Sequence, residues 1–400
     1  MMTEEEKTKL RFVSTNKGTT IIGKLCDFCI YENGKYTSFG EQPETCSFTT
    51  NICINQMPYY FFIKKNEQSI IVFSQFRIPF DMPKSGAEII KIFKNDLIKA
   101  INNLKPFENC ILEARYGTTK KSFYDVENIL FYNIGTSKFK PFTNQGVVFS
   151  AVSEEEIIDL RNKYNIPDEY AHYYEYKLIK NKKQKEFTSL LAELKNISLK
   201  CLGITPATTW KTIKTNENNI QVYNSIDCDC GDTFSIVLEI KKPKNSSFNI
   251  MTAMKPLLDG LICAFHNSQF TEDELEYFSQ KLNCNKSLLI KNSINVLGER
   301  KSKYLQIYRN NVKWNPADDL CNYVAISVKD GNGWSINGNI YSTIKCPRCG
   351  KGKLSKLLWG LPAFDEQMCL DIESGKIKLA GCLVEEIKPR YYCRWCKKEF

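Results

Sequence analysis

The chain has 400 residues, more than the roughly 250 to 300 at which one hydrophobic core stops growing, so two or three packed domains are expected. With 42% hydrophobic and 25% charged residues, the composition is that of a globular protein and excludes disordered and collagen-like architectures. The net charge of +10 suits an anionic partner, but it is spread over the whole chain and selects no function by itself.

The seventeen cysteines do not indicate a secreted disulfide scaffold. Their number is odd, the chain is long, and the N-terminal residues MMTEEEKTKLRF lack a basic-then-apolar signal segment. The most apolar stretch, 250–265, is interrupted by Lys255, Pro256 and Asp259, whereas a membrane helix needs roughly 18 uninterrupted apolar residues. We therefore expect a cytoplasmic protein with reduced thiols and no membrane partner.

The first part of the chain, 1–150, is predicted to be an α/β half. Residues 59–78 contain two aromatic and β-branched runs, YYFFI and IIVFSQFRI, with a polar turn between them, which is typical of a hairpin. Apolar residues then recur at helical spacing over 86–102. A strand over 110–116 and an acidic segment that begins at Asp125 follow.

A helical connector is expected over 151–202. Ser153 and Glu156 have the spacing of a capping box at a helix start, and Pro167 should break the helix into two parts. The strongly basic run Lys177–Lys185 is interpreted as a solvated helix face, with contact to phosphate groups as the alternative.

The same order of elements recurs over 203–335. Two hairpin-like runs, IQVYNSI and FSIVLEIK, precede a Pro-Lys turn, a helix over about 248–265 and a strand that ends at Arg309. Thr271 and Glu274 mark an inserted helix with its own capping box. The predicted class is α/β (α+β), with a tandem-duplicated strand-strand-helix-strand body; the alternative is that this order recurs by chance.

The strongest motif lies in the final part, 336–400. Cys346-Pro-Arg-Cys349 and Cys393-Arg-Trp-Cys396 are two C-x-x-C knuckles, 43 residues apart, and four thiolates satisfy a tetrahedral zinc ion without an open position. The segment resembles the zinc-ribbon class, which implies a structural zinc held by these four cysteines. Residues 341–400 contain twelve basic and seven acidic residues, so contact with nucleic acid is one of the expectations.

Other cysteines give weaker signals. The knuckle Cys26-Asp-Phe-Cys29 with Cys46 and Cys53 is half of a second zinc motif, and ordinary strand cysteines are the alternative. The one-residue spacer in Cys228-Asp-Cys230 disfavours a standard knuckle. Two further cysteines in the zinc-ribbon gap, Cys369 and Cys382, are expected to pack in the core, and the alternative is that they support a second ion or replace a ligand.

An acidic constellation in the second half indicates metal-assisted hydrolysis. Lys255 and Asp259 share a helix face at i and i+4, and Asp318 and Asp319 follow Trp314. Carboxylates hold Mg²⁺, the ion activates water, and a lysine offsets phosphate charge. This pattern resembles the RusA-type Holliday-junction resolvases, which implies a Mg²⁺-dependent nuclease with these four residues in its active site. Alternatively, Lys255 and Asp259 form a salt bridge and the Asp pair caps a turn.

Three positions depart from that family pattern. The paired aspartates expected upstream of the lysine are Asn249 and Met251, and in the first half Ile98 occupies the acidic position. Asp125 and Glu127 parallel the later Asp pair.

Two function classes follow from these motifs. The first is a nucleic-acid-interacting protein with a structural zinc ribbon and a candidate nuclease site. The second is a non-enzymatic protein-binding or assembly module, in a bacterial defence or mobile-element context, with a zinc-stapled tail. With only His172 and His266 in the chain, a Ser-His-Asp or His-rich metal site is not expected. A redox role for the C-x-x-C pairs is a third alternative.

Overall fold

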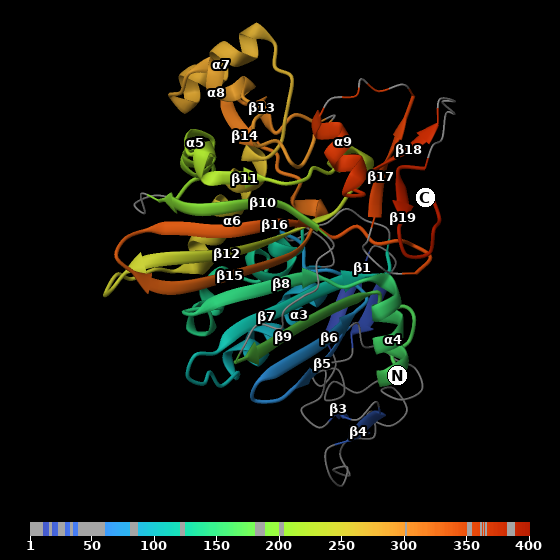
Figure 1. Ribbon diagram of the computed structural model, residues 1–400. Coiled ribbons are helices and arrows are strands. Elements are labelled where there is room, and N and C mark those ends of the chain that lie inside the picture. The colour runs from blue at the N-terminus through green and yellow to red at the C-terminus, as the bar shows by residue number, and fades with distance from the viewer. Residues whose placement is uncertain are drawn as a thin grey trace. The chain divides into compact units, whose positions relative to one another are not determined.

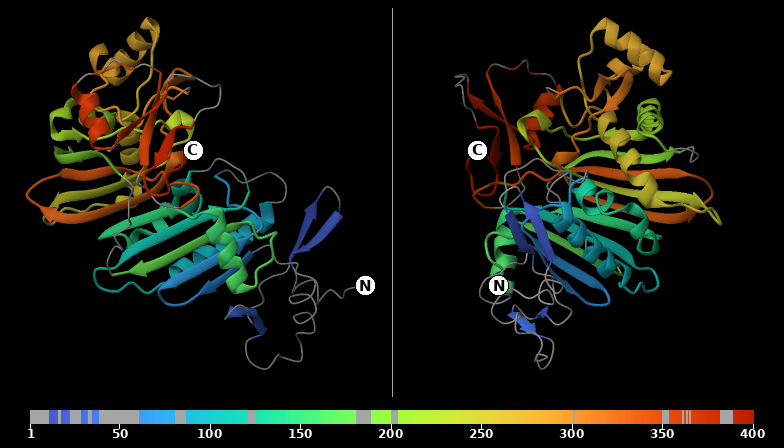
Figure 2. Two further views of the ribbon diagram at one scale, coloured as in Figure 1. Left: turned by 45° about the vertical axis from the view of Figure 1, so that its right-hand side comes forward. Right: turned by 180° about the vertical axis from the view of Figure 1, so that it is seen from behind.

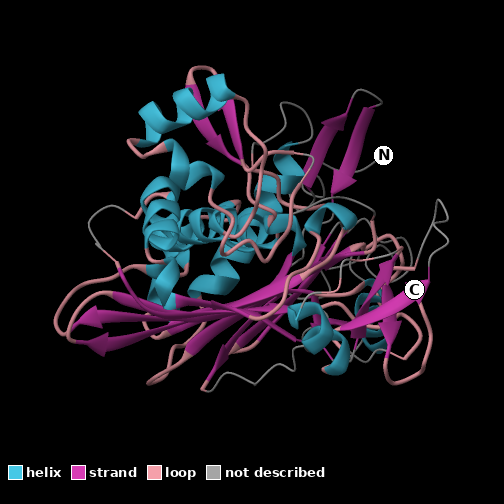
Figure 3. Cartoon of the chain, turned by 45° about the horizontal axis from the view of Figure 1, so that its top comes forward, coloured by secondary structure: helices cyan, strands magenta, loops and turns pink. Residues whose placement is uncertain are grey.

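The computed structural model describes two compact units, each built from three chain segments. The first unit comprises 1–182, 239–258 and 323–334, and the second comprises 183–238, 259–322 and 335–400. The described residues are 11–15, 18–22, 29–32, 35–38, 61–80, 87–120, 125–180, 189–199, 204–300, 302–349, 354–360, 362, 364, 366–381 and 389–400. Helices and strands are mixed throughout, so the fold class is α+β (Figures 1 and 3).

The main sheet of the first unit has the strand order β12-β15-β8-β7-β9-β6-β5. The strands are β5 (Phe61–Lys65), β6 (Ser69–Ser74), β7 (Ile111–Thr118), β8 (Gly146–Ala151), β9 (His172–Ile179), β12 (Phe234–Pro243) and β15 (Cys321–Gly331). The β7–β8 pair is parallel and the β8–β15 pair is antiparallel, so the sheet is mixed. Two separate hairpins, β1 (Arg11–Thr15) with β2 (Gly18–Ile22) and β3 (Cys29–Glu32) with β4 (Lys35–Ser38), precede it.

Alternation along these strands creates two aromatic faces. On one face, Phe93 of α3 (Ala87–Asn102) lies 4.8 Å from Phe61 and 5.8 Å from Tyr174, measured between ring centroids. The adjacent positions Phe62 and Tyr173 point to the other face and pack in a cluster with α4 (Glu154–Tyr164). Because successive side chains of a strand point to opposite faces, the same strands can bury both helices. Figure 2 shows α3 against the sheet.

The second unit contains the strand order β11-β10-β16-β12 and the remaining helices. Its strands are β10 (Ser189–Ser198), β11 (Ile220–Val222) and β16 (Ser335–Ser342), and β13 (Leu305–Tyr308) pairs with β14 (Asn311–Trp314) as a separate hairpin. Its helices are α5 (Pro206–Thr215), the C-terminal part of α6 (Ile250–Ala264), α7 (Glu272–Leu282) and α8 (Lys286–Ile290).

The C-terminal module of the second unit is a small three-stranded sheet with one helix. Its strand order is β18 (Ile377–Gly381), β17 (Leu354–Trp359) and β19 (Tyr391–Cys393), and α9 (Glu366–Glu373) precedes β18. No helix in the described part of the chain is long and apolar enough to span a membrane.

Several predicted elements are confirmed. The hairpin predicted over 59–78 is β5 with β6. The helix predicted over 86–102 is α3, and the strand predicted over 110–116 is β7. The capping box of α7 is complete, because Thr271 accepts from the backbone N–H of Glu274 while the Glu274 side chain accepts from that of Thr271. At α4 the Ser153 side chain accepts the N–H of Glu156.

The prediction of a helical connector is wrong beyond α4. Asn165 adopts the left-handed conformation and ends the helix before Pro167, so the proline does not divide a longer helix. The next segment, HYYEYKLI, forms β9, and Ser189–Ser198 forms β10. Lys177 therefore lies on a strand rather than a helix face, and 181–188 lie outside the described residues. Aromatic and β-branched residues in alternation favour a strand, and this signal outweighs the polar composition of the segment.

The expected repeat of strand-strand-helix-strand is present in order but differs in pairing. In the second half, β11 pairs with β10, whereas β12 lies between β16 and β15, so β11 and β12 do not form a hairpin. The strand after α6 is β13, which pairs only with β14 in its own two-stranded sheet. The strands of the two halves thus have different hydrogen-bonded partners. Pro83-Lys84, the turn in the first half that corresponds to Pro243-Lys244, lies outside the described residues.

Candidate metal centre and the pocket beside it

The four C-terminal cysteines form the group of side chains best suited to hold a metal ion. Their sulfur atoms all lie within 4.8 Å of one another, and the Cys346–Cys396 and Cys349–Cys393 distances are 3.6 and 3.5 Å. Sulfurs at the corners of a tetrahedron, each about 2.3 Å from zinc, would be about 3.8 Å apart. The sequence prediction that the two knuckles converge is therefore confirmed, and the arrangement fits one tetrahedrally held ion.

Backbone contacts of the C-terminal module hold the knuckles in place. The N–H of Cys393 donates to the Lys398 carbonyl over 2.7 Å, and Lys397 donates back to the Cys393 carbonyl over 2.9 Å. Lys397 takes the left-handed conformation that this turn requires. In addition, Leu354 of β17 lies opposite Cys393 of β19 in the antiparallel register. The strand pairing thus fixes the position of the second knuckle.

The electrostatic environment of the knuckle favours a thiolate at one position. The backbone N–H of Cys396 donates to the sulfur of Cys393 over 3.4 Å, and this interaction lowers the pKa of Cys393 to about 6. Burial and the neighbouring sulfur of Cys346 raise the pKa of Cys396 to about 12. Four crowded sulfurs cannot all be anionic without a cation, whereas a bound divalent ion would stabilise every thiolate in the group.

The cysteines outside the quartet are placed differently from one another. Cys369 is exposed on α9, which corrects the expectation that it packs in the core, and Cys382 lies outside the described residues. Cys228 is buried and Cys230 exposed, and neither belongs to a group of three or more close metal-ligating side chains in the described part of the chain. The side chains of the N-terminal set lie outside the described residues; these are Cys26, Cys29, Cys46 and Cys53.

A buried acid joins the C-terminal module to the rest of the second unit. Asp232 is 5% exposed, and its carboxylate accepts from Arg390 over 2.7 Å, from the Tyr391 hydroxyl and from the backbone N–H of Asp227 over 3.0 Å. Arg390 also donates to the Cys230 carbonyl over 3.1 Å. Burial and the Asp232 carboxylate raise the pKa of Tyr391. The sequence carries no signal for the Arg390–Asp232 contact, because the two residues are 158 positions apart.

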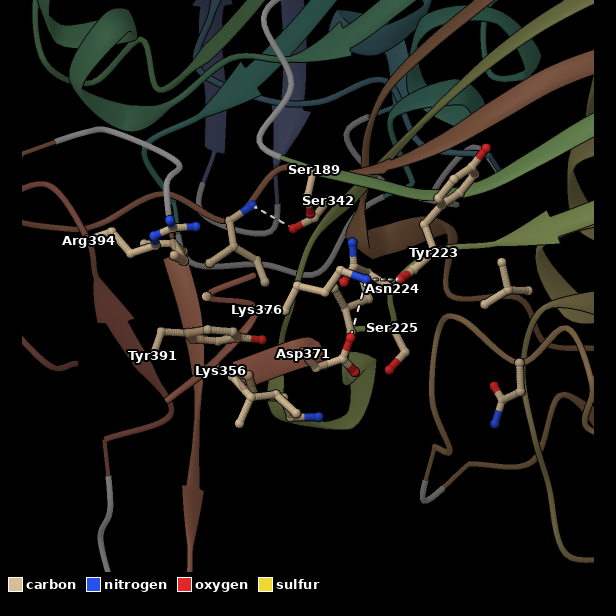
Figure 4. A pocket seen from close by; sticks show the side chains of 17 residues that line it. Ser189, Tyr223, Asn224, Ser225, Ser342, Lys356, Asp371, Lys376, Tyr391 and Arg394 are labelled. Atoms are coloured by element: carbon tan, nitrogen blue, oxygen red, sulfur yellow. Dashed lines mark hydrogen bonds and ion pairs between the residues drawn. The ribbon is translucent and has the colours of Figure 1, made fainter. Parts of the chain in front are cut away.

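A pocket of about 720 Å³ lies between the C-terminal module and the β10–β11 region of the same unit (Figure 4). Its charged lining residues are Lys356, Lys376, Arg394 and Asp371. Arg394 is the first spacer residue of the second knuckle, so the pocket and the cysteine quartet share a turn. The basic excess of this module is visible in the sequence, but no sequence pattern indicates that three of its cations line one cavity.

The four residues of the predicted nuclease site lie on two elements, α6 and a short 3-10 turn. Lys255 on α6 forms an ion pair with Asp125 over 3.0 Å, and its backbone N–H donates to the Tyr132 hydroxyl over 3.2 Å. Asp259 lies one turn further along α6 and is partly buried. Asp125 is thus one partner of Lys255, although the sequence pattern marks it only as a parallel to the later Asp pair.

The adjacent pair Asp318 and Asp319 lies on a short 3-10 turn before β15. Asp319 faces Arg300 at 3.5 Å. None of these aspartates belongs to the metal-ligating group found among the described residues, which is the cysteine quartet. The catalytic assignment of Asp259, Asp318, Asp319 and Lys255 stays a prediction.

Comparison with known proteins gives no match to a family model, to a curated protein or to a solved structure. The resemblance to RusA-type resolvases therefore has no support from a family match. The metal-binding arrangement at the C-terminus rests on the geometry of its own four sulfurs.

Proposed function

We propose that this protein binds nucleic acid through its C-terminal module and that a zinc ion held by the cysteine quartet stabilises this module. The observation that carries the proposal is the position of the quartet beside a pocket lined by Lys356, Lys376 and Arg394. A three-stranded sheet of this size buries too little apolar surface to be stable alone, which is why a structural ion would matter here. Lysine and arginine side chains supply the sequence-independent attraction to phosphate.

Elemental analysis of the purified protein tests the metal part of the proposal. We expect one zinc per chain at this site, released by Cys393→Ser because three sulfurs hold the ion far more weakly than four. The matched control is Cys369→Ser, which removes an exposed cysteine of the same module and should retain the zinc. Full zinc content in Cys393→Ser, or no zinc in the unaltered protein, would contradict the assignment.

Binding to labelled single-stranded, duplex and branched DNA at two salt concentrations tests the nucleic-acid part. Affinity should fall as salt rises, because phosphate contacts release bound counterions. Absence of binding at low salt would favour the alternative, a protein-interaction or assembly module in a defence or mobile-element system.

Mg²⁺-dependent cleavage is a narrower form of the same proposal. If Asp259, Asp318 and Asp319 hold the ion and Lys255 contacts phosphate, replacing Asp318 and Asp319 with asparagine should abolish cleavage of branched DNA while DNA binding persists. Cleavage that survives this double replacement would remove the active-site assignment and leave the binding function untouched.

A further inference from the structure

The pocket beside the cysteine quartet has two chemically different walls. One wall comes from the C-terminal module; it carries Lys356 of β17, Lys376 before β18, Tyr391 at the start of β19 and Arg394 directly after β19. The other comes from the β10–β11 region and from the end of β16. It carries the apolar Val222 and four neutral polar side chains; these are Ser189, Asn224, Ser225 and Ser342. Figure 4 shows Lys376 extending between the two walls.

Positive charge predominates in the pocket. Asp371 is the single carboxylate among the lining residues, and it lies 3.4 Å from the Lys376 ammonium, which also donates to the Tyr223 carbonyl. Arg394 donates to the Ser374 carbonyl over 3.3 Å, a contact that leaves its charge uncompensated. Lys356 forms no ion pair with any residue that the structure describes. Two of the three cations are thus available to an anion.

The neutral lining suits the remainder of a ligand whose anionic group meets these cations. Serine hydroxyls and an asparagine amide can exchange hydrogen bonds with sugar hydroxyls and base edges. The Asn224 amide is already oriented, because it donates to the Leu190 carbonyl over 3.1 Å. Val222, Ile377 and the Tyr391 ring offer apolar surface to a planar base. The volume lies within the roughly 300 to 1,000 Å³ of pockets that enclose small ligands.

We propose that this pocket binds one nucleotide unit, with its phosphate group held by Lys356 and its sugar and base against the neutral wall. This inference deepens the proposed function and rests on it where the nucleotide is part of a strand. The same chemistry would also accept a free nucleoside monophosphate, so the experiment includes both sources.

Two substitutions with opposite expected effects test the pocket. Lys356→Gln removes one phosphate contact and should weaken binding of a fluorescein-labelled single-stranded oligonucleotide by about tenfold at low salt. Asp371→Asn removes the one lining carboxylate and releases Lys376, so it should tighten the same binding. A merely structural role of these residues would move both affinities downward.

A matched control distinguishes binding in the pocket from non-specific electrostatic attraction between the module and the oligonucleotide. Lys398→Gln removes an exposed charge of the same module that does not line the pocket, and its affinity should stay within about twofold of the unaltered protein. Lys356→Gln should also reduce the slope of log affinity against log salt concentration by about 0.7, which is the contribution of one phosphate of a single strand. A change in the zinc content of this variant would instead indicate that its fold is damaged.

Competition by adenosine 5′-monophosphate identifies the source of the nucleotide. Displacement of the oligonucleotide that depends on Lys356 supports a site for a free or terminal nucleotide. Oligonucleotide binding that depends on Lys356 and resists the monophosphate supports a site for an internal unit. Unchanged affinity in both Lys356→Gln and Asp371→Asn overturns the inference.

The two proposals fail in distinguishable ways. If the unaltered protein binds DNA and both pocket variants bind it equally well, the pocket assignment is lost and the proposed function stands. If no DNA binds but the monophosphate binds and Lys356→Gln weakens it, the proposed function is lost and the pocket remains a nucleotide site.

Discussion

Both histidines of the chain are buried and kept neutral. Burial lowers the pKa of His172 to about 4, helped by the charges of Lys120 and Arg77, and burial lowers the pKa of His266 to about 4 as well. The Nδ1 atom of His172 lies 2.8 Å from the Tyr116 hydroxyl, and Nδ1 of His266 lies 3.2 Å from the Gly298 carbonyl. Neither ring lies at the metal centre, so both act on stability.

Acid should destabilise the protein through these rings. The pKa of each is lower in the folded chain than the unfolded value of 6.5, so the unfolded chain binds more protons between pH 6.5 and 4. Stability is therefore present above pH 6.5 and lost as the pH falls toward 4. The free energy of unfolding, measured by urea titration, should be lower at pH 5 than at pH 7 by about 2 kcal/mol per histidine. His172→Gln should remove the contribution of one histidine to this pH dependence. An unchanged pH dependence in that variant would contradict this account.

Asp232 concentrates three donors on one carboxylate and should be sensitive to the loss of its charge. Asp232→Asn leaves Arg390 facing a neutral amide, and we expect the free energy of unfolding to fall by about 2 kcal/mol. Urea titration measures the change. Glu399→Gln, which breaks the more exposed pair with Lys378, should change stability by less than about 1 kcal/mol. Equal effects of the two variants would refute a special role for Asp232.

At the scale of elements, helices with clear caps and periodicity were predictable and strand partners were not. The α3 and α7 predictions succeeded because apolar spacing and a capping box act within a few neighbouring residues. β9 was missed because it was placed within a helical connector in spite of its alternating aromatics. β11 pairs with β10, in which Ala192 lies opposite Val222, and β12 lies between β15 (Cys321–Gly331) and β16 (Ser335–Ser342). A local pattern does not encode these choices of partner.

The cysteine quartet was predictable for a related reason. Each C-x-x-C pair is local, and the demand of one ion for four thiolates links the two pairs. The pocket cations have no such link, because Lys356 on β17 and Arg394 after β19 come to line one pocket only through the pairing of those two strands.

The contact between α5 and α6 depends on a glycine. A Cβ atom at Gly260 would lie 2.4 Å from the Pro206 carbonyl oxygen and 2.7 Å from the Thr209 side chain. Gly260→Ala should gain about 1 kcal/mol in helix propensity but lose more to overpacking, because a backbone carbonyl cannot move aside. We expect a net loss of about 1 to 2 kcal/mol in thermal or urea unfolding.

Gly333→Ala is the control for this substitution. A Cβ atom there meets nothing within 4 Å, so stability should change by no more than about 0.5 kcal/mol. A Gly260→Ala protein as stable as the unaltered chain would show that the two helices can separate without cost.

At the scale of the whole molecule, neither compact unit is a continuous stretch of chain. The first unit needs 239–258 and 323–334 in addition to 1–182. Within it, β15 covers one edge of β8 over Tyr323–Ser327, and the β8 residues from Gly146 to Phe149 are all buried. Composition suggests domains that are continuous stretches of chain. Such a division leaves out segments such as β15, which comes late in the chain but pairs with β8 in the sheet of the first unit.

A fragment of residues 1–202 should therefore not fold to a stable unit. It lacks β15, which leaves an apolar strand edge open to association with other chains. We expect aggregation or poor amide protection of 61–180 in hydrogen exchange. A chain ending at 345 retains every segment of the first unit and should protect the same amides. Equal protection in both fragments would show that the first unit tolerates the loss of its late strands.

The late arrival of β15 also has a consequence during synthesis. A ribosome adds roughly 5 to 20 residues each second, so the nascent chain would wait on the order of ten seconds or more between completing β8 and supplying its neighbour. During that interval a row of unsatisfied amides beside Val147 and Phe149 is open to chaperones and to other nascent chains. Slow translation of the middle of this message should lower the yield of folded protein.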